Sequence, residues 1–425
     1  MFNVADDENA LKRSVGEAKA AASVLRTLKS SQKNVALHEM ADALLRRTDE
    51  ILRENAQDVT DAKAARRPSA MVDRLLLDED RVAAMAKGVR DVAALPDPIG
   101  AVDVGYRLPN GLEVIRKRVP LGVVAVIYEG RPNVTSDAAA LCLKSGNAVV
   151  LRGSSVAARS NAIIADVLVR ALMEAELPQA SIVTVNGDYD QLKALLQMND
   201  LLDLVVPRGG EELKSFLMEH SKVPVIYAAS GNNHVYVDAH ADIDKAVKIT
   251  VNAKVQRPGV CNAAETLLVH AAVADQMLPA LAGALTSHGV ELRVSDDARA
   301  AIGDGAAQLA TATDEDFATE YQNLTMAVKV VADIDEAIAH VERYGSGHSE
   351  AIVTEDLTAA RRFEAGVDAA CVYINASTRF TDGGEFGMGA EIANSTQKLH
   401  ARGPIGVNEL TSMKYVVTGD GHVRT

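Results

Sequence analysis

Short apolar runs alternate with helical patterns through most of this chain, and this rhythm restricts the fold more than any other feature. The runs predict a first series of strands at 122–127, 148–151, 182–185, 204–206 and 225–228, and a second at 267–269, 328–331, 351–353 and 372–374. Strands that alternate with helices form parallel βαβ units with right-handed crossovers. The sequence therefore predicts an α/β fold with two parallel sheets, and with Cys261 near their junction. Ligand clefts commonly form at such junctions.

Three segments outside this rhythm carry signals of their own. The first hundred residues predict helices, because apolar residues such as Val82, Met85 and Val89 recur on one helical face. The Asn110–Gly111 pair is typical of the tip of a β-hairpin. The region 296–319, rich in Asp, Ala, Thr and Gly, is expected to be a mobile insertion.

Composition and charge exclude several classes of protein. A chain of 425 residues is long enough for two or more domains with cores of their own. Its net charge of −14 argues against nucleic acid or an anionic membrane as the partner. No apolar run approaches the roughly 20 residues of a membrane span, and the acidic N-terminus does not have the pattern of a secretory signal. Three distant cysteines do not form a disulfide framework, so we expect a cytoplasmic protein.

Cys261 is the candidate nucleophile of the chain. It follows a helical run, 242–254, and the Pro258–Gly259 pair ends that helix and turns the backbone. Backbone N–H groups at such a bend can face a ligand, and a thiol held there can act as a thiolate. On these residues alone a small buried side chain is an equal alternative. Cys142 and Cys371, in apolar helix and strand patterns, fit that alternative better.

Two segments are candidates for binding phosphate groups, although no GxGxxG pattern follows the first strand. Gly209 and Gly210 connect a strand to a helix whose free N–H groups could hold a pyrophosphate. Taken by itself, an ordinary βα turn is the commoner explanation of these two glycines. Arg152 and Ser154, at the end of another strand, are of the type that meets adenosine phosphates.

Polar residues also follow the strand predicted at 122–127. Ligands favour the carboxyl ends of strands in α/β sheets. Arg131 offers a cation suited to phosphate, and Asn133 offers an uncharged amide donor. The alternative for this pair is a helix cap beside a solvated arginine.

Other chemistries have weaker support. His340 and His348 are spaced unlike any standard metal site and have no cysteine near them, so no metal is predicted. The chain contains no GxSxG elbow, which argues against a serine hydrolase.

Four blocks of sequence resemble the aldehyde dehydrogenase superfamily, and the likeness covers nearly the whole chain. The blocks are 126–135, 256–262, 337–352 and 375–387. The resemblance implies a Rossmann-like cofactor-binding domain (1–104, 120–256 and 385–402), a catalytic domain (257–384) and a β-hairpin oligomerisation arm (105–119 and 403–425).

Within that superfamily the chain is most similar to members that reduce an acyl phosphate. This implies NADPH-dependent reduction of L-glutamate 5-phosphate to L-glutamate 5-semialdehyde and phosphate, the second step of proline biosynthesis from glutamate. Cys261 would form the thioester, and the Asn133 amide and the Cys261 N–H would stabilise the oxyanion. The resemblance also implies a homo-oligomer (dimer or tetramer) and a functional association with glutamate 5-kinase.

The resemblance assigns roles to further residues. Glu320 would hold the nicotinamide ribose, and the adenosine end of NADPH would meet Arg152, Ser154, Gly209 and Gly210. The substrate would meet Arg131, Ser377, Thr378 and Arg379, with Arg379 on its α-carboxylate.

One departure from the superfamily pattern favours reduction over hydrolysis. Hydrolytic members carry a glutamate base where this chain has Ala-Ala-Ser-Gly-Asn-Asn at 228–233, with no carboxylate. Two alternatives stay open: a non-catalytic binding protein on the same scaffold, and another acylating dehydrogenase of the coenzyme A type. The motif 128–133 argues against the second alternative.

Overall fold

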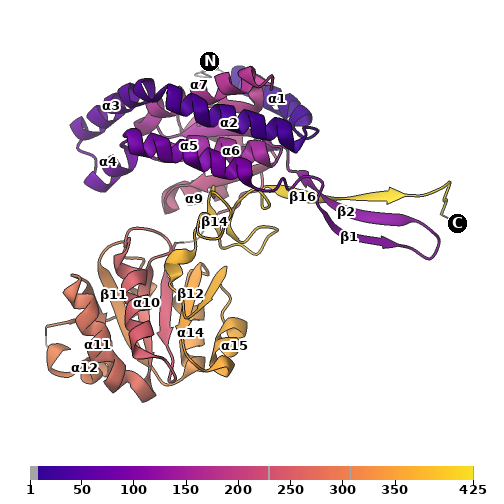
Figure 1. Cartoon of the computed structure of the whole chain (residues 1–425). Coiled ribbons are helices and arrows are strands. Elements are labelled where there is room, and N and C mark those ends of the chain that lie inside the picture. Colours follow the sequence, from indigo (N-terminus) through magenta and orange to yellow (C-terminus); the bar gives the residue numbers. More distant parts are fainter. Residues whose placement is uncertain (1–7, 228–229, 307, 425) are drawn as a thin grey trace. The chain divides into compact units, whose positions relative to one another are not determined.

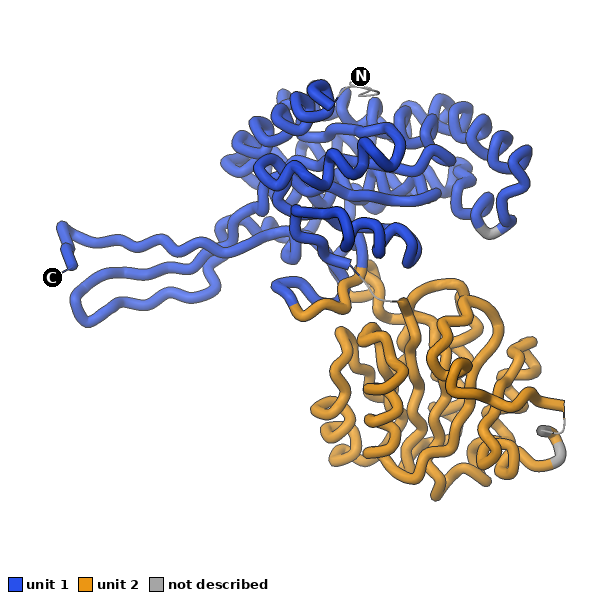
Figure 2. Tube along the Cα trace, turned by 180° about the vertical axis from the view of Figure 1, so that it is seen from behind, with its two compact units in different colours: residues 1–227, 387–393, 399–425 blue, residues 228–386, 394–398 orange. Residues whose placement is uncertain are grey.

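The computed structural model describes residues 8–227, 230–306 and 308–424. The chain divides into two compact units (Figure 2). Unit 1 consists of residues 1–227, 387–393 and 399–425, and unit 2 of residues 228–386 and 394–398.

Unit 1 begins with the predicted helices. They are α1 (Glu8–Leu25), α2 (Ser30–Arg46), α3 (Thr48–Ala64), α4 (Ser69–Leu75) and α5 (Glu79–Ala94). Val82, Met85 and Val89 are buried on one face of α5 as predicted, and Asp78 caps this helix by accepting the Arg81 N–H at 2.8 Å. The prediction of a helical N-terminal region is confirmed.

A four-stranded sheet forms the centre of unit 1. Its strands are β3 (Val123–Tyr128), β4 (Ala148–Gly153), β5 (Ile182–Thr184) and β6 (Leu204–Arg208), in the order β5-β4-β3-β6 and all parallel. The helices between and after them are α6 (Asn133–Lys144), α7 (Ala158–Glu174), α8 (Tyr189–Leu196) and α9 (Glu211–His220). Every residue of β3 is buried, as expected for a parallel strand with helices on both faces.

An antiparallel sheet projects from the rest of unit 1 (Figure 1). It has the order β1-β2-β16, with β1 (Val102–Arg107), β2 (Glu113–Pro120) and β16 (Thr411–Thr418). Arg107 pairs with Glu113, and Gly111 has φ +94°, so the predicted hairpin at Asn110–Gly111 is confirmed. We call this sheet the arm. It leaves large apolar side chains exposed, including Tyr415 (61%) and Val417 (56%).

Unit 2 is built on a seven-stranded parallel sheet in the order β10-β9-β11-β8-β7-β12-β13. The strands are β7 (Asn233–Val237), β8 (Ala264–His270), β9 (Glu291–Val294), β10 (Ala310–Thr311), β11 (Thr325–Val331), β12 (Ser349–Val353) and β13 (Cys371–Ile374). The helices are α10 (Ile243–Val255), α11 (Ala274–Ser287), α12 (Asp296–Ile302), α13 (Asp314–Ala318), α14 (Ile334–Tyr344) and α15 (Leu357–Gly366).

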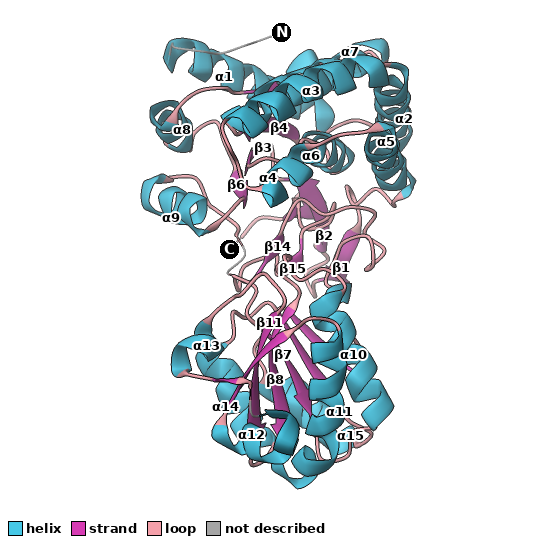
Figure 3. Ribbon diagram, turned by 90° about the vertical axis from the view of Figure 1, so that its left-hand side faces the viewer, coloured by secondary structure: helices cyan, strands magenta, loops and turns pink. Residues whose placement is uncertain are grey.

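Alternate side chains of each central strand face different helices. Val235 and Val237 of β7 pack in a core with α10 and α11, whereas Tyr236 packs in a second core with α14 and α15. Figure 3 shows α10 and α11 on one side of the sheet and α14 on the other. Both faces are therefore covered, which explains why the strands read as continuous apolar runs.

Two predictions about elements need correction, and several strands were not predicted. The strand expected at 225–228 is a single bridge, Val225 to Val205, and residue 228 lies outside the described residues. The region 296–319, expected to be an insertion, contains α12, β10 and α13. β7 was not predicted, because its sequence Asn-His-Val-Tyr-Val mixes polar and apolar residues. β9, β10 and two short strands, β14 (Asn394–Ser395) and β15 (Gly403–Pro404), also went unpredicted.

The compact units differ from the predicted domain limits chiefly at 228–256, and also at 385–386 and 394–398, all of which belong to unit 2. The prediction assigns residues up to 256 to the cofactor-binding domain, but β7 is hydrogen-bonded between β8 and β12 in the sheet of unit 2. The segment from β7 to α10 therefore packs with the residues that follow it. The roles assigned to the domains remain predictions. No helix in the described chain is both long and apolar enough to span a membrane.

Candidate active site

Cys261 lies on a tight turn at the amino end of β8. Asp242 caps α10 by accepting the Lys245 N–H at 2.9 Å, and the helix ends at Val255, before Pro258. The Ala263 N–H then donates to the Val260 carbonyl at 3.0 Å and closes the turn around the cysteine. Cys261 is half-buried, whereas Cys142 and Cys371 are buried. Burial also raises the pKa of Cys142, so Cys261 is the cysteine suited to react.

Asn233, the first residue of β7, holds this turn in place through hydrogen bonds of its side-chain amide. Its Nδ2 donates to the carbonyls of Cys261, Ala263 and Gly231 at 2.8, 2.7 and 2.9 Å. Its Oδ1 accepts the Ser349 N–H at 3.1 Å. A Cβ on Gly231 would lie 1.8 Å from the Cys261 carbonyl oxygen, so only glycine fits at that position. Sequence reasoning missed the role of Asn233.

The segment after β13 fixes the same turn from the other side. Asn262 donates to the Thr381 carbonyl at 2.9 Å, and the Thr378 hydroxyl donates to the Asn262 carbonyl at 2.7 Å. Arg379 donates from Nε to Gln256 Oε1 at 2.8 Å and from Nη1 to Asn262 Oδ1. Ser377 Oγ accepts the Arg379 N–H at 3.3 Å. The structure therefore brings the predicted Ser377, Thr378 and Arg379 to the cysteine turn.

A buried ion pair links the turn to the segment that carries Glu320. Lys254, in the last turn of α10, bonds Glu265, which is the extra residue of a β-bulge in the β7–β8 pairing. Glu265 Oε1 accepts the Gln322 N–H at 3.3 Å, and Lys254 Nζ lies 5.9 Å from the centre of the Tyr321 ring. Burial raises the pKa of Glu265 to about 7, against the opposing charge of Lys254. The predicted Glu320 thus sits in a segment anchored beside the turn.

A second buried polar group lies at this edge of the sheet. The His234 N–H donates to Glu350 Oε2 at 2.7 Å, and His234 Nδ1 lies 2.9 Å from the same oxygen. The His340 ring meets the His234 ring edge to face at 5.4 Å. Burial, and next the charge of His234, lowers the pKa of His340 to about 3. Among the described residues, no group of three or more His, Cys, Asp or Glu is arranged to hold a metal ion.

In unit 1 the predicted residues gather at the carboxyl ends of β3, β4 and β6. The Gly210 N–H, at the start of α9, donates to Glu129 Oε2 at 3.2 Å. A Cβ on Gly209 would lie 2.7 Å from Leu213 Cδ2 and 2.8 Å from the Glu129 carboxyl carbon. The structure thus adds Glu129, which the sequence motif contained but to which no role was assigned. Its carboxylate accepts a hydrogen bond from the Gly210 N–H, one of the N–H groups predicted to bind a pyrophosphate.

The remaining predicted residues of unit 1 lie at the same edge. Arg152 Nη2 donates to the Gly187 carbonyl at 3.1 Å, and Ser154 Oγ accepts the Gly130 N–H at 3.4 Å. Asn133 opens α6 with an exposed side chain that donates to Asp137 Oδ2 at 2.9 Å. Burial raises the pKa of Asp137 to about 6, and this hydrogen bond partly opposes the rise. Arg131, half-buried, lies just before Asn133.

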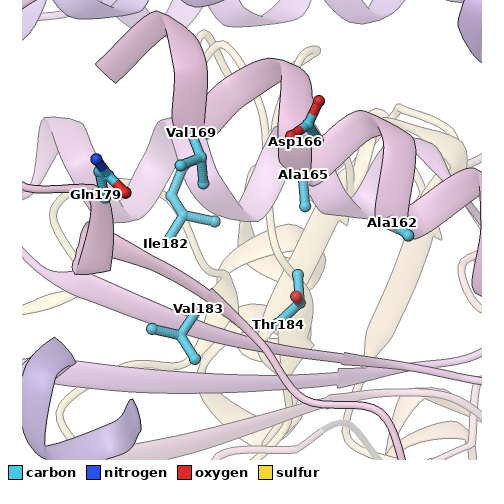
Figure 4. Close-up of a pocket in the computed structure, with 8 residues that line it drawn as sticks. All are labelled: Ala162, Ala165, Asp166, Val169, Gln179, Ile182, Val183 and Thr184. Carbon is cyan, nitrogen blue, oxygen red and sulfur yellow. The ribbon is translucent and has the colours of Figure 1, made fainter. Parts of the chain in front are cut away.

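A pocket in unit 1 lies apart from these residues. It is formed between α7 and β5 (Figure 4), and its lining consists of Ala162, Ala165, Asp166, Val169, Gln179, Ile182, Val183 and Thr184. None of these is a predicted site residue. Asp166 is already paired with Arg47 at 2.8 Å and Arg170 at 3.0 Å, so the pocket offers no uncommitted charge.

Comparison with known proteins places the chain in a class. The model of the aldehyde dehydrogenase family matches residues 3–304 and 311–416, so the chain belongs to that family. Within it, the gamma-glutamyl phosphate reductase of Thermobifida fusca is 51% identical over 420 residues, which are 99% of this chain and 100% of that protein. The chain therefore belongs to the gamma-glutamyl phosphate reductases.

Solved structures agree with this assignment. The crystal structure of gamma-glutamyl phosphate reductase from Thermotoga maritima is 44% identical and has a TM-score of 0.95, covering 99% of this chain and all of that one. An acetylating aldehyde dehydrogenase from Geobacillus thermoglucosidasius, at 18% identity and a TM-score of 0.71 over 98% of each chain, shares the fold. The predicted fold class is confirmed.

Proposed function

We propose that this protein reduces L-glutamate 5-phosphate to L-glutamate 5-semialdehyde and phosphate, the second step in making proline from glutamate. The observation that carries this proposal is the turn at Cys261: the reactive cysteine is half-buried and braced by Asn233 and Arg379, in a chain 51% identical to a gamma-glutamyl phosphate reductase. Bracing of this kind holds a nucleophile in one geometry, which is where much of the rate gain of an enzyme arises.

The reaction begins at the sulfur of Cys261. An acyl phosphate is already activated, so the thiolate can displace phosphate and form a thioester. Asn133 is our proposed donor to the oxyanion that develops on the acyl oxygen, and losing one such donor typically costs about 10²–10³ in rate. The described part of the 228–233 stretch, Ser230 to Asn233, carries no carboxylate that could activate water against the thioester.

Members of this family use a nicotinamide cofactor, and we propose NADPH. The glycine cradle at Gly209, where a Cβ would meet Leu213 and Glu129, fits a close approach of a dinucleotide to the backbone. Arg152, Ser154, Gly209 and Gly210 would hold its adenosine end, and Glu320 its nicotinamide ribose. When bound, NADPH supplies the hydride that reduces the thioester.

We further propose a homo-oligomer assembled through the arm. A sheet edge with exposed apolar side chains such as Tyr415 and Val417 is a surface that another subunit can cover. We propose a cytoplasmic location, a dimer or tetramer, and a functional association with glutamate 5-kinase, which makes the unstable acyl phosphate. Arg131, Ser377, Thr378 and Arg379 are the proposed substrate contacts.

A phosphate-dependence assay tests the proposal. In the reverse direction, NADPH should form from L-glutamate 5-semialdehyde and NADP only when inorganic phosphate is present. Adding coenzyme A in place of phosphate should give no NADPH, and NAD should be a poorer acceptor than NADP. Activity with coenzyme A, or activity without phosphate, would contradict the proposed function.

A further inference from the structure

Two arginines converge on the turn that carries Cys261. Arg257 lies in the turn itself, and Arg379 reaches it from the segment after β13. The Arg379 guanidinium donates to Gln256, the neighbour of Arg257, at 2.8 Å, and to Asn262, the neighbour of Cys261. The Arg379 side chain therefore bridges the two ends of the turn, next to Arg257 at one end and next to Cys261 at the other. These bonds use Nε and Nη1, so Nη2 is not engaged by any residue that the structure describes and can meet a ligand.

Neither cation has a carboxylate partner within the described chain. The guanidinium of Arg379 bonds neutral amide oxygens, and the exposed Arg257 forms no ion pair there. Burial, and next repulsion from Arg257, lowers the pKa of Arg379, so the two guanidinium groups act on each other. Asp382, Cys261 and Glu385 act in the opposite direction but more weakly than burial. Two neighbouring guanidinium groups that form no ion pair with a carboxylate are stabilised when an anion joins them.

We propose that Arg257 and Arg379 bind the phosphoryl group of the substrate and hold it as it departs, an inference that rests on the proposed function. The sulfur of Cys261 bonds the acyl carbon, and the bond from that carbon to the bridging oxygen breaks. The thiol proton ends on the departing phosphate, which leaves as hydrogen phosphate. The planar forks of two guanidinium groups match the oxygens of such a group.

This assignment changes the role predicted for Arg379. The sequence comparison puts Arg379 on the α-carboxylate of the substrate, at the far end of the glutamyl chain. In the structure Arg379 bonds the residue next to the nucleophile. The phosphoryl group is joined to the attacked carbon through a single oxygen, so it is the anion nearest to the sulfur. Arg257, which had no predicted role, becomes its second contact.

The first test measures phosphate binding without turnover. Cys261 is alkylated with iodoacetamide in the full-length protein, with and without inorganic phosphate. Phosphate should slow the alkylation of the wild type, and Arg257→Gln should need about 10- to 100-fold more phosphate for the same protection, the range typical of a lost charged hydrogen bond. Arg361→Gln, an exposed arginine of α15 in the same unit, is the matched control and should behave as the wild type.

The second test separates the two ends of the substrate. In the reverse reaction, Arg257→Gln should raise the KM for phosphate about 10- to 100-fold and leave the KM for semialdehyde within about twofold. Arg257→Lys keeps the positive charge but loses the planar fork of the guanidinium group. Its KM for phosphate should therefore lie between those of the wild type and Arg257→Gln. An unchanged phosphate KM with a raised semialdehyde KM would overturn the inference and return the arginines to the carboxylate. Wild type that needs no phosphate would instead refute the proposed function, while phosphate protection of Cys261 would still support the anion site.

Discussion

The two parallel sheets of this protein present their candidate sites at opposite ends of their strands. In unit 1 the predicted residues follow the carboxyl ends of β3, β4 and β6, where ligands of α/β proteins ordinarily bind. In unit 2 Cys261 precedes β8, and Asn233 and Ser349 begin β7 and β12, so the site lies at the amino ends. The same kind of sheet thus supports two different kinds of site.

The means of support differ accordingly. The turn at Cys261 is held by the side chains of Asn233, Asn262 and Arg379, through hydrogen bonds to backbone and amide groups. The edge of unit 1 instead offers glycine backbone, where the Gly210 N–H donates to Glu129 Oε2 at 3.2 Å. A nucleophile must be held in one geometry, whereas a dinucleotide is bound by backbone N–H groups that stay accessible. Disturbing the first edge should therefore affect the chemical step, and disturbing the second should affect nucleotide binding.

The largest effect should come from Cys261→Ser. A serine hydroxyl is a much weaker nucleophile than a thiolate, so kcat should fall by about 10³ or more. The readout is NADPH oxidation with the acyl phosphate, beside the melting temperature. Cys142→Ser, in the core of unit 1, is the contrasting control: it should cost stability more than turnover. A Cys261→Ser enzyme working near the wild-type rate would falsify the thioester mechanism.

Gly231→Ala should come next, because the obstacle to its Cβ is backbone. The new Cβ would lie 1.8 Å from the Cys261 carbonyl oxygen, so the turn itself must move. A misplacement on the order of 1 Å costs about 10²-fold, and we expect that loss in kcat with a slower alkylation of Cys261. Gly283→Ala in α11 is the matched control, since nothing lies within 4 Å of its Cβ. If Gly231→Ala kept full kcat as Gly283→Ala should, catalysis would not depend on the present position of the turn at Cys261.

Gly209→Ala should have a smaller effect of a different kind. Its Cβ would meet the ends of the Leu213 and Glu129 side chains, at 2.7 and 2.8 Å, and these can move. We expect the KM for the nucleotide to rise about tenfold, the change typical of one weakened contact to phosphate, with kcat and the alkylation rate of Cys261 nearly unchanged. A loss confined to kcat would contradict the assignment of nucleotide binding to the edge of unit 1 and of the chemical step to the edge of unit 2.

Much of this arrangement was readable from the sequence, and the exceptions share a cause. Apolar runs and the Asn110–Gly111 pair predicted most strands and the hairpin, because those signals are local. Ser377, Thr378 and Arg379 were tied to the cysteine through a sequence block. Asn233 and Glu265 were not, because their hydrogen-bond partners are distant in sequence and leave no local signal.

The smallest effect concerns His340, whose buried position makes the stability of unit 2 depend on pH. The pKa of His340 is lowered to about 3, mainly by burial, from an ordinary value of 6.5. The unfolded chain then binds the proton more tightly, so this contribution to stability is complete above about pH 6.5 and is lost as the pH falls toward 3. The groups that face the ring include Phe317, His234 and Tyr344, with the charges of Lys329 and Arg343 also acting on it.

His340→Phe should remove that dependence. Between pH 4 and 6 the wild type should lose about 1.4 kcal/mol of unfolding free energy per pH unit more than the variant, as one titrating group requires. Urea unfolding at several pH values measures the difference, and His288→Gln, at an exposed position of unit 2, serves as the control and should keep the wild-type slope. Equal slopes for wild type and His340→Phe would mean that the ring is protonated without cost, and hence that the polar group around Glu350 is open to water. That outcome would remove the contrast between a rigidly packed edge in unit 2 and an accessible one in unit 1.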